Sequence, residues 1–193
     1  MKRYIKMVAA LLTLMASFTA CENGDQDFDD YEGGTTAYFA YQSPVRTIVL
    51  GDDEYDTTLD KAHKCKILAT FGGSYNGRNA TVNVAVDNSL CDNLTFADGT
   101  PVKAMPAEYY QLSTTAFNFN GGMKGGTEVQ LTDAFFNDPD AVKNTYVIPL
   151  VMQNQTGFDR IATGTLKEGK TGSRTNASIW ETAPQDYVMY CVK

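Results

Sequence analysis

The chain has 193 residues, a formal net charge of −7, and hydrophobic residues at 43% of its positions. This length fits one domain, or one domain and the start of another. The apolar fraction is enough to bury a core, which excludes wholesale disorder. The acidic balance excludes the strongly basic footprint of a nucleic-acid-binding protein. A single histidine disfavours a histidine-rich metal site and a histidine-based catalytic triad.

The start of the chain has the pattern of a secretion signal. Three basic residues precede Met7–Phe18, an apolar stretch too short to span a bilayer. Thr and Ala then lead directly into Cys21, and this run resembles a lipobox, in which the cysteine thiol receives diacylglycerol. The residue three positions before the cysteine is usually Leu, whereas here it is Phe18. We predict that 1–20 form a signal peptide and that Cys21 is lipidated; the alternative is an ordinary signal peptide with a chance cysteine.

The segment 21–34 is predicted to be a solvated tether that follows the lipidated cysteine. Six acidic residues lie between Glu22 and Glu32, and such a stretch cannot bury apolar area. An acidic stretch in this place also resembles the surface-export signal of Bacteroidetes lipoproteins. This resemblance favours a lipid-anchored position on the outer membrane that faces the cell exterior. The alternative is a flexible spacer with no role in export.

From residue 33 onward, apolar side chains recur with the period of two that is typical of β-strands. Seven short runs follow this pattern or are continuously apolar: Thr36–Tyr41, Val45–Leu50, Cys65–Phe71, Val82–Val86, Phe117–Asn120, Glu128–Leu131 and Tyr146–Met152. Their number and spacing predict an all-β sandwich. The last run is apolar almost throughout, as in a strand that is buried on both faces. Because Pro149 cannot donate to a ladder, we expect that strand to lie at an edge or to carry a bulge there.

The chain changes character after Ile161. Residues 162–178 are rich in Thr, Gly, Ser, Lys and Asn, which is typical of a linker or long loop. One strand-like run, Tyr187–Val192, follows, and a lone strand has no ladder partner of its own. We therefore predict that 35–166 hold the stable fold. Residues 167–193 are expected to be a linker and the start of a truncated second domain, and to contribute little stability.

A series of short motifs keeps its order along nearly the whole folded part. They are Tyr38–Gln42, Pro44–Gly51, Leu90–Cys91, Phe96–Gly99, Met105–Pro106, Tyr109–Leu112, Val129–Phe136 and Tyr146–Leu150. Together they resemble the N-terminal domain of a group of Bacteroidetes surface lipoproteins. The resemblance implies an immunoglobulin-like β-sandwich of about seven strands and of undefined function. It implies a place in front of glycan-binding, laminin-G-like or endo-β-N-acetylglucosaminidase domains, in a glycan-utilisation system. Parts of 174–193 resemble the linker and first strand of the second domain.

Exposed aromatic side chains next to amide or carboxylate groups are the residue types that hold sugar rings. Tyr75 and Asn76 bring these types together in a loop, and Trp180 is another aromatic outside the expected core strands. We predict these three residues as candidate glycan contacts. The alternative is structural, with Trp180 belonging to the linker.

The other reactive residue types have a structural interpretation. The acidic run Asp52–Asp60 carries oxygen ligands suited to calcium but lacks the EF-hand spacing, which favours a solvated loop. His63 is predicted to lie in a surface loop. Cys65 and Cys91 lie in or beside strands, which favours buried thiols over a disulfide. Cys191 is expected to be exposed if its own domain is missing.

The sequence contains no nucleophile elbow, phosphate loop or metalloprotease motif. We therefore predict a non-catalytic, lipid-anchored surface module that spaces or presents a glycan-binding domain, with no metal and no cofactor. Its expected partners are the membrane, through the lipid anchor, a glycan and an outer-membrane transporter complex, but no nucleic acid. Two alternatives remain: a directly glycan-binding lipoprotein, and the N-terminal part of an endo-β-N-acetylglucosaminidase-type glycosidase.

Overall fold

The computed structural model describes residues 29–40, 45–48 and 62–192, and its secondary structure is 44% strand and 13% helix. The strands are β1 Thr36–Phe39, β2 Val45–Ile48, β3 Lys64–Gly72, β4 Thr81–Val86, β5 Lys103–Ala104, β6 Tyr110–Leu112, β7 Ala116–Asn118, β8 Lys124–Leu131, β9 Tyr146–Thr156, β10 Arg160–Ile161, β11 Thr165–Leu166, β12 Trp180–Thr182 and β13 Tyr187–Val192. The helical turns are η1 Asn88–Cys91, η2 Ala107–Tyr109, α3 Asp133–Asn137, α4 Pro139–Lys143 and η3 Ala177–Ile179. Within these ranges, no helix has the length and apolar character to cross a membrane.

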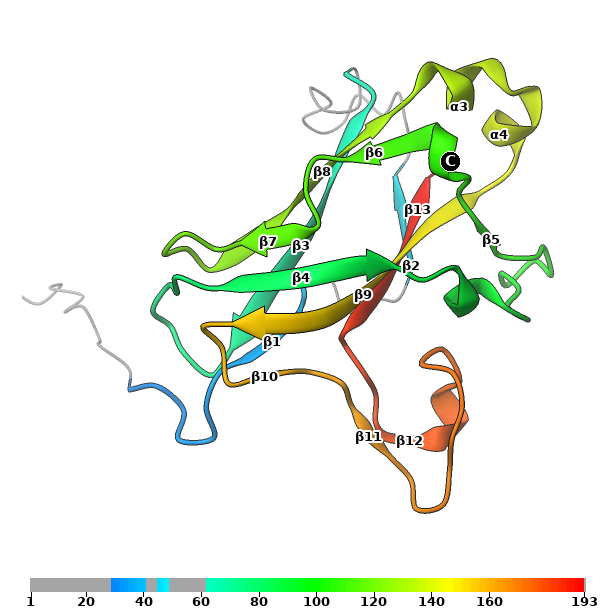
Figure 1. Cartoon of the computed structure of the whole chain (residues 1–193). Coiled ribbons are helices and arrows are strands. Elements are labelled where there is room, and N and C mark those ends of the chain that lie inside the picture. Colours follow the sequence, from blue (N-terminus) through cyan, green and yellow to red (C-terminus); the bar gives the residue numbers. More distant parts are fainter. Residues whose placement is uncertain (1–28, 41–44, 49–61, 193) are drawn as a thin grey trace, which may run out of the picture.

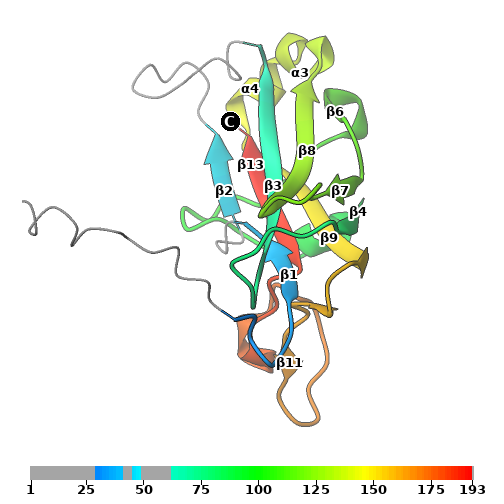
Figure 2. The ribbon, with the colours of Figure 1, turned by 90° about the vertical axis from the view of Figure 1, so that its left-hand side faces the viewer.

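The strands form two main sheets that face one another (Figures 1 and 2). Sheet I has the strand order β10-β1-β3-β8-β6. Sheet II has the order β2-β13-β9-β4-β7, and β5 pairs with β9 beside this path. A separate pair, β11-β12, belongs to a lobe that extends from one end of the molecule (Figure 1). The predicted all-β sandwich is confirmed, although several strands of two or three residues raise the number above seven.

The main core lies between the two sheets. Strand β3 shows how the sequence builds it, because every second side chain of this strand is buried. Phe39 of β1 meets Phe117 of β7 edge to face, with the ring centroids 6.3 Å apart. Near one end of the sandwich, Phe71 lies 4.9 Å from Phe158 and 5.9 Å from Phe119, between ring centroids. Such aromatic pairs add about 0.5–1.5 kcal/mol to the stabilisation from buried area.

Sheet II is also covered on its outer face. Val147 and Val151 of β9 and Met189 and Cys191 of β13 form a second buried cluster, together with side chains from residues 90–104. Strand β9 therefore buries six consecutive side chains after its first residue, and β13 buries five. The prediction that Tyr146–Met152 is buried on both faces is confirmed.

The prediction that Pro149 marks an edge strand or a bulge is wrong. Strand β9 is central in sheet II, and the shift in its register with β4 falls between Asn83 and Val84. The N–H of Asp87, just beyond the last β4 residue, donates to the Pro149 oxygen at 3.0 Å. Because the nitrogen and oxygen of one strand residue face the same neighbour, the Pro149 nitrogen faces the end of the β4 ladder. Its missing N–H therefore costs no bond to β13.

The predicted boundary after Leu166 does not follow the strand pairing. Strand β13 is not a lone strand: it pairs antiparallel with β9 over six residues and parallel with β2 over four. Alternate side chains of β13 belong to the main core, and Cys191, which was expected to be exposed, is 0% exposed. The partners of β13 come from distant parts of the chain, so no local pattern identifies them. Residues 187–192 are an integral part of the sandwich.

The segment 162–178, predicted to be a linker or long loop, lies within a lobe, residues 162–186, that precedes β13. Arg174 donates from Nε to both carboxylate oxygens of Asp186, each at 3.1 Å. The Asp186 side chain is 0% exposed, and burial raises its pKa although Arg174 opposes the shift. At the base of the lobe, the Gln185 N–H donates to the Ala162 oxygen at 2.8 Å. These contacts hold the lobe together, and the Met152 N–H of β9 donates to the Asp186 oxygen at 2.8 Å, which attaches the lobe to sheet II.

Candidate functional site

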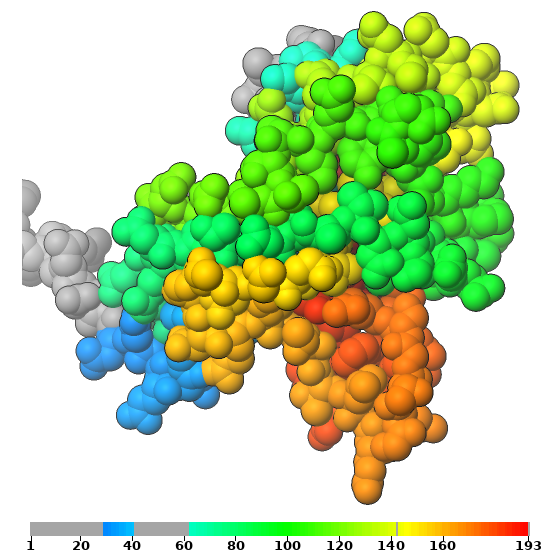
Figure 3. Space-filling model, viewed as in Figure 1, coloured from blue at the N-terminus to red at the C-terminus, as the bar shows by residue number. Residues whose placement is uncertain are grey.

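Loops from distant parts of the sequence meet at one end of the sandwich, on the left in Figures 1 and 3. They are residues 29–35, the β3–β4 turn at 73–80, the β7–β8 turn at 119–123 and the β9–β10 turn at 157–159. The Tyr31 N–H donates to the Gly73 oxygen at 2.8 Å, which joins the first loop to the second. An isolated β-bridge between Arg78 and Gly122 joins the second loop to the third.

Two aspartates fix the first loop in place. The Asp30 carboxylate pairs with Arg78, and its hydrogen bond with Ser74 is the main cause that holds the pKa of Asp30 below its ordinary value. The Asp159 carboxylate accepts from the N–H and the hydroxyl of Thr35 at 2.6 and 2.8 Å. These two bonds lower the pKa of Asp159. Both carboxylates are therefore ionised at neutral pH and serve to join loops.

A hollow of about 570 Å³ lies among these loops. Its lining includes Asp29, Tyr31, Phe71, Ser74, Tyr75 and Met123. The Tyr31 side chain is 69% exposed and the Tyr75 side chain is 75% exposed. We call this feature the tyrosine hollow. It combines exposed aromatic surface with a carboxylate and a hydroxyl, which suits a small ligand with both apolar and polar surface.

The structure separates the three predicted glycan contacts. Tyr75 lines the tyrosine hollow, and Asn76 is exposed beside it, with its N–H donating to the Ser74 hydroxyl at 3.0 Å. Trp180 is half-buried on β12 opposite Leu166, in the lobe that Figure 1 places away from the β3–β4 turn. Trp180 therefore does not share a site with the other two.

Sequence reasoning missed Tyr31, which it placed in the acidic tether. The acidic residues of 21–34 led to the prediction of a solvated tether. The local sign of an ordered loop was an aromatic residue close to Gly33 and Gly34. Gly33 has a steric role, because a Cβ there would overlap Cε1 of the Tyr31 ring unless that ring moved. The glycine thus lets the Tyr31 ring fold back against its own backbone.

A second hollow, of about 690 Å³, lies beside η1 and β5 on the outer side of sheet II. Its lining includes Cys91, Asp92, Asn93, Pro101 and Lys103. Burial raises the pKa of the Cys91 thiol to about 11. Because the thiolate is the nucleophilic form, this position disfavours reaction at Cys91 at neutral pH.

The prediction of buried thiols at Cys65 and Cys91 is confirmed. Cys65 is 5% exposed and Cys91 is 8% exposed, and each packs within one of the two apolar clusters. Cys191, as noted for β13, is a buried thiol as well.

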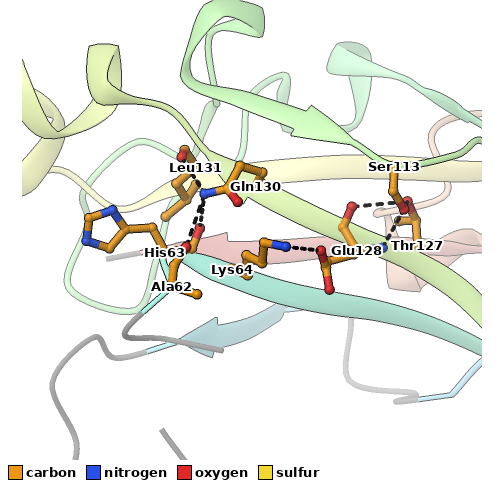
Figure 4. A network of polar contacts seen from close by, with 8 residues as sticks. All are labelled: Ala62, His63, Lys64, Ser113, Thr127, Glu128, Gln130 and Leu131. Carbon is orange, nitrogen blue, oxygen red and sulfur yellow. Dashed lines mark hydrogen bonds and ion pairs between the residues drawn. The ribbon is translucent and has the colours of Figure 1, made fainter. Parts of the chain in front are cut away.

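His63 lies in a surface turn, as predicted, and has a structural role there (Figure 4). Its ring lies against Phe136, with centroids 4.0 Å apart. Its backbone oxygen accepts from Gln130 Nε2 at 3.2 Å and from the Leu131 N–H at 2.9 Å. Lys64, the first residue of β3, forms an ion pair with Glu128, with Nζ and Oε1 2.6 Å apart. These contacts register β3 against β8.

Within the described ranges, no three His, Cys, Asp or Glu side chains gather closely enough to hold a metal ion. Cys21 and the acidic run Asp52–Asp60 lie outside these ranges.

A protein-family model described as an N-terminal domain matches residues 30–159. Among solved structures, a Bacteroides ovatus protein of unknown function is 44% identical over 86% of this chain, with a TM-score of 0.76. The chain spans 52% of that protein. No curated protein gives a significant match.

Two further solved structures share much less sequence with this chain. A putative carbohydrate binding protein from Bacteroides ovatus is 14% identical over 82% of this chain and 36% of its own, with a TM-score of 0.47. EndoBT-3987 from Bacteroides thetaiotamicron, solved with a Man5GlcNAc product, is 12% identical over 81% of this chain and 30% of its own, also with a TM-score of 0.47.

The family match covers well over half of the chain, and it includes every strand of the two main sheets except β10 and β13. The protein therefore belongs to this family of N-terminal domains, and the resemblance carried by its short sequence motifs is confirmed.

Proposed function

We propose that this chain is a non-catalytic spacer module of a lipid-anchored surface protein, and that it holds a glycan-binding domain away from the outer membrane. One observation carries the proposal. The loop 29–35, which precedes β1, lies at one end of the sandwich, and β13 ends at the opposite end, in both views (Figures 1 and 2). When the chain enters a module at one end and leaves it at the other, the length of the module separates the membrane tether from the next domain.

The sheet gives the module rigidity along this direction. The 11 residues of β9, at about 3.3 Å each, span roughly 35 Å. Strand β13 is hydrogen-bonded on both sides, so a domain joined after it would be connected directly to sheet II. Strand β1, which follows the tether, lies in sheet I, so the connection from the tether to such a domain crosses the packed core between the two sheets rather than a flexible linker.

Family membership supports the same role. The family is one of N-terminal domains, and the 44% identical Bacteroides ovatus protein is about twice as long as the matched region. The glycan context and the lipid anchor are those implied by the sequence motifs and by the signal pattern before Cys21.

Four aspartates with shifted pKa values have structural partners, which supports a structural role for these four. A general acid needs a pKa raised towards neutrality, whereas Asp30, Asp138 and Asp159 have pKa values lowered by hydrogen bonds. Asp186 has a raised pKa, but it is buried against Arg174.

The test uses the full chain with an epitope tag after Lys193, expressed in its native host type. We expect protease added to intact cells to remove the tag, and palmitate to label the protein. Cys21→Ala should abolish the label and release the protein from the membrane fraction. A matched Cys91→Ala chain should keep both properties. A tag protected on intact cells, or a Cys21→Ala chain that stays labelled, would overturn the anchored-spacer proposal.

A second candidate function, direct ligand binding by this domain, is favoured by the tyrosine hollow. The two functions are compatible, because the hollow lies at the end where the described chain begins and leaves the end of β13 open.

A further inference from the structure

Exposed large apolar side chains gather at one place on this molecule. In the described ranges five are exposed: Tyr31, Tyr75, Val86, Met123 and Leu166. Three of the five line the tyrosine hollow, and the two tyrosines are the most exposed of all. Isolated exposed apolar residues need no explanation, whereas a cluster around one concave surface indicates a binding site.

The loops that carry the two tyrosines are joined to one another before any ligand arrives. The backbone bond from Tyr31 to Gly73 lies two residues before Tyr75. The neighbours of both tyrosines are joined as well, through the contacts of Asp30 with Ser74 and Arg78. The two rings therefore lie on loops that are already hydrogen-bonded to each other, so that ligand binding requires little ordering of these loops.

The polar groups of the hollow indicate the class of ligand. Asp29 and the Ser74 hydroxyl line it among the apolar groups. The nearby Arg78 is paired with Asp30, so it supplies no unbalanced positive charge. The lining thus offers aromatic faces and hydrogen-bonding oxygens, while an anionic ligand would meet the Asp29 carboxylate without a compensating cation. A ligand with an apolar face, several hydroxyl groups and no charge matches these features.

We propose that the tyrosine hollow binds a neutral sugar ring of an oligosaccharide, with Tyr31 and Tyr75 as the stacking residues and Asp29 as a hydroxyl acceptor. The C–H face of a sugar ring packs against an aromatic ring, and its hydroxyl groups bond to carboxylate and hydroxyl oxygens. The volume of about 570 Å³ lies in the range of small-ligand sites, about 300–1,000 Å³. This site goes beyond the spacer role and does not depend on it.

The test measures binding to the purified full chain in mild detergent. The probes are neutral gluco-, manno-, galacto- and N-acetylglucosamine oligosaccharides of two to six units, first on an array and then by calorimetry. An acidic galacturonan fragment and a lysine-rich peptide serve as charged probes. We expect at least one neutral series to bind and the charged probes to fail.

The variants assign the binding to the hollow. Tyr31→Ala and Tyr75→Ala should each weaken binding by about threefold to tenfold, the range expected for loss of one aromatic contact. Tyr75→Phe should bind like the natural chain, because the ring face remains. Val86→Ala and Leu166→Ala remove exposed apolar side chains outside the hollow and should leave affinity unchanged. Far-ultraviolet circular dichroism confirms that each variant is folded.

Three outcomes would overturn the proposal: no neutral probe binds, only a charged probe binds, or a folded Tyr31→Ala/Tyr75→Ala chain binds neutral sugar with natural affinity. None of these outcomes bears on whether the module is anchored and spaces a second domain. A failed sugar site therefore leaves the spacer proposal to its own test.

Discussion

Asp186 is a fully buried charged side chain, and Arg174 is its partner in an ion pair. Removing one member of a buried ion pair leaves the other charge without compensation, which typically costs about 3–5 kcal/mol. The Arg174 side chain is 37% exposed, so water screens part of that loss. The pair attaches the lobe to the residue that directly precedes β13.

We expect Arg174→Met to lower the free energy of unfolding by about 2 kcal/mol, below the range for a fully buried pair. Chemical denaturation monitored by circular dichroism measures this change. Lys64→Met is the matched control, since it breaks the Lys64–Glu128 pair, in which both side chains are about a third exposed. Its loss should stay under about 1 kcal/mol. Equal losses for the two variants would contradict the role assigned to burial.

The Tyr109 hydroxyl hydrogen-bonds to the Asp138 carboxylate, and this bond is the main cause that raises the pKa of Tyr109 to about 12. The unfolded chain releases the same proton near pH 10. This contribution to stability is therefore fully present below about pH 10 and is lost as the pH rises through 12.

We expect Asp138→Asn to lower the pKa of Tyr109 towards 10, because the carboxylate charge and its strong acceptor are removed. Asn preserves the N-cap of α4, so the helix should remain. Carbon-13 NMR of labelled tyrosine rings measures the titration, with Tyr109→Phe to assign the signal. A titration that is identical in the natural and Asp138→Asn chains would rule out this hydrogen bond.

At the scale of elements, β13 has the largest consequence for the fold. Its last five side chains are each at most 4% exposed. Burial of one large apolar side chain contributes about 1.5–3 kcal/mol. Four of the five side chains are of this kind, and their summed burial is comparable to the free energy of about 5–15 kcal/mol that stabilises a whole domain. Loss of β13 would also remove the backbone hydrogen bonds along one side of β9.

We expect a chain that stops at Leu166 to unfold or aggregate, rather than to keep the stability predicted from sequence. Thermal melting by circular dichroism and gel filtration provide the measurements. A chain that stops at Val192 is the control and should melt like the natural protein, because it keeps all of β13. A cooperative melt of the shorter chain within a few degrees of the control would show that β13 is dispensable.

At the scale of the whole molecule, three buried thiols report on cooperativity. Cys65 belongs to the main core, while Cys91 and Cys191 belong to the cluster on the outer face of sheet II. If the two layers unfold together, the three thiols become accessible in one step. If the outer layer opens first, Cys91 and Cys191 react while Cys65 stays protected.

We expect single-step exposure, because β9 and β13 contribute side chains to both clusters. The experiment adds a thiol reagent to the Cys21→Ala chain over a denaturant series and locates the labelled residues by mass spectrometry. In native buffer all three should react slowly, and Cys91 gains further protection from its raised pKa. Rapid native labelling of one cysteine would reveal a local opening that the fold does not predict.

The sequence by itself determined the class of fold and the character of individual strands. The period-two pattern of β3 and β4 and the continuous apolar run in β9 are local consequences of which faces are buried, and a local pattern is sufficient to read them. Sequence motifs also identified the family. Tyr75 was predicted as a candidate contact from the same kind of local evidence, as an aromatic residue within a loop.

Only the tertiary structure decided which strands pair and which residues share a site. Strand β13 looked unpaired because its partners, β2 and β9, lie far away in the chain, and Pro149 fits a central strand because β4 ends beside it. Tyr31 joins Tyr75 through hydrogen bonds that link residues more than 40 positions apart. Such contacts depend on how the whole chain folds in three dimensions, and a local sequence pattern does not specify which distant segments come together.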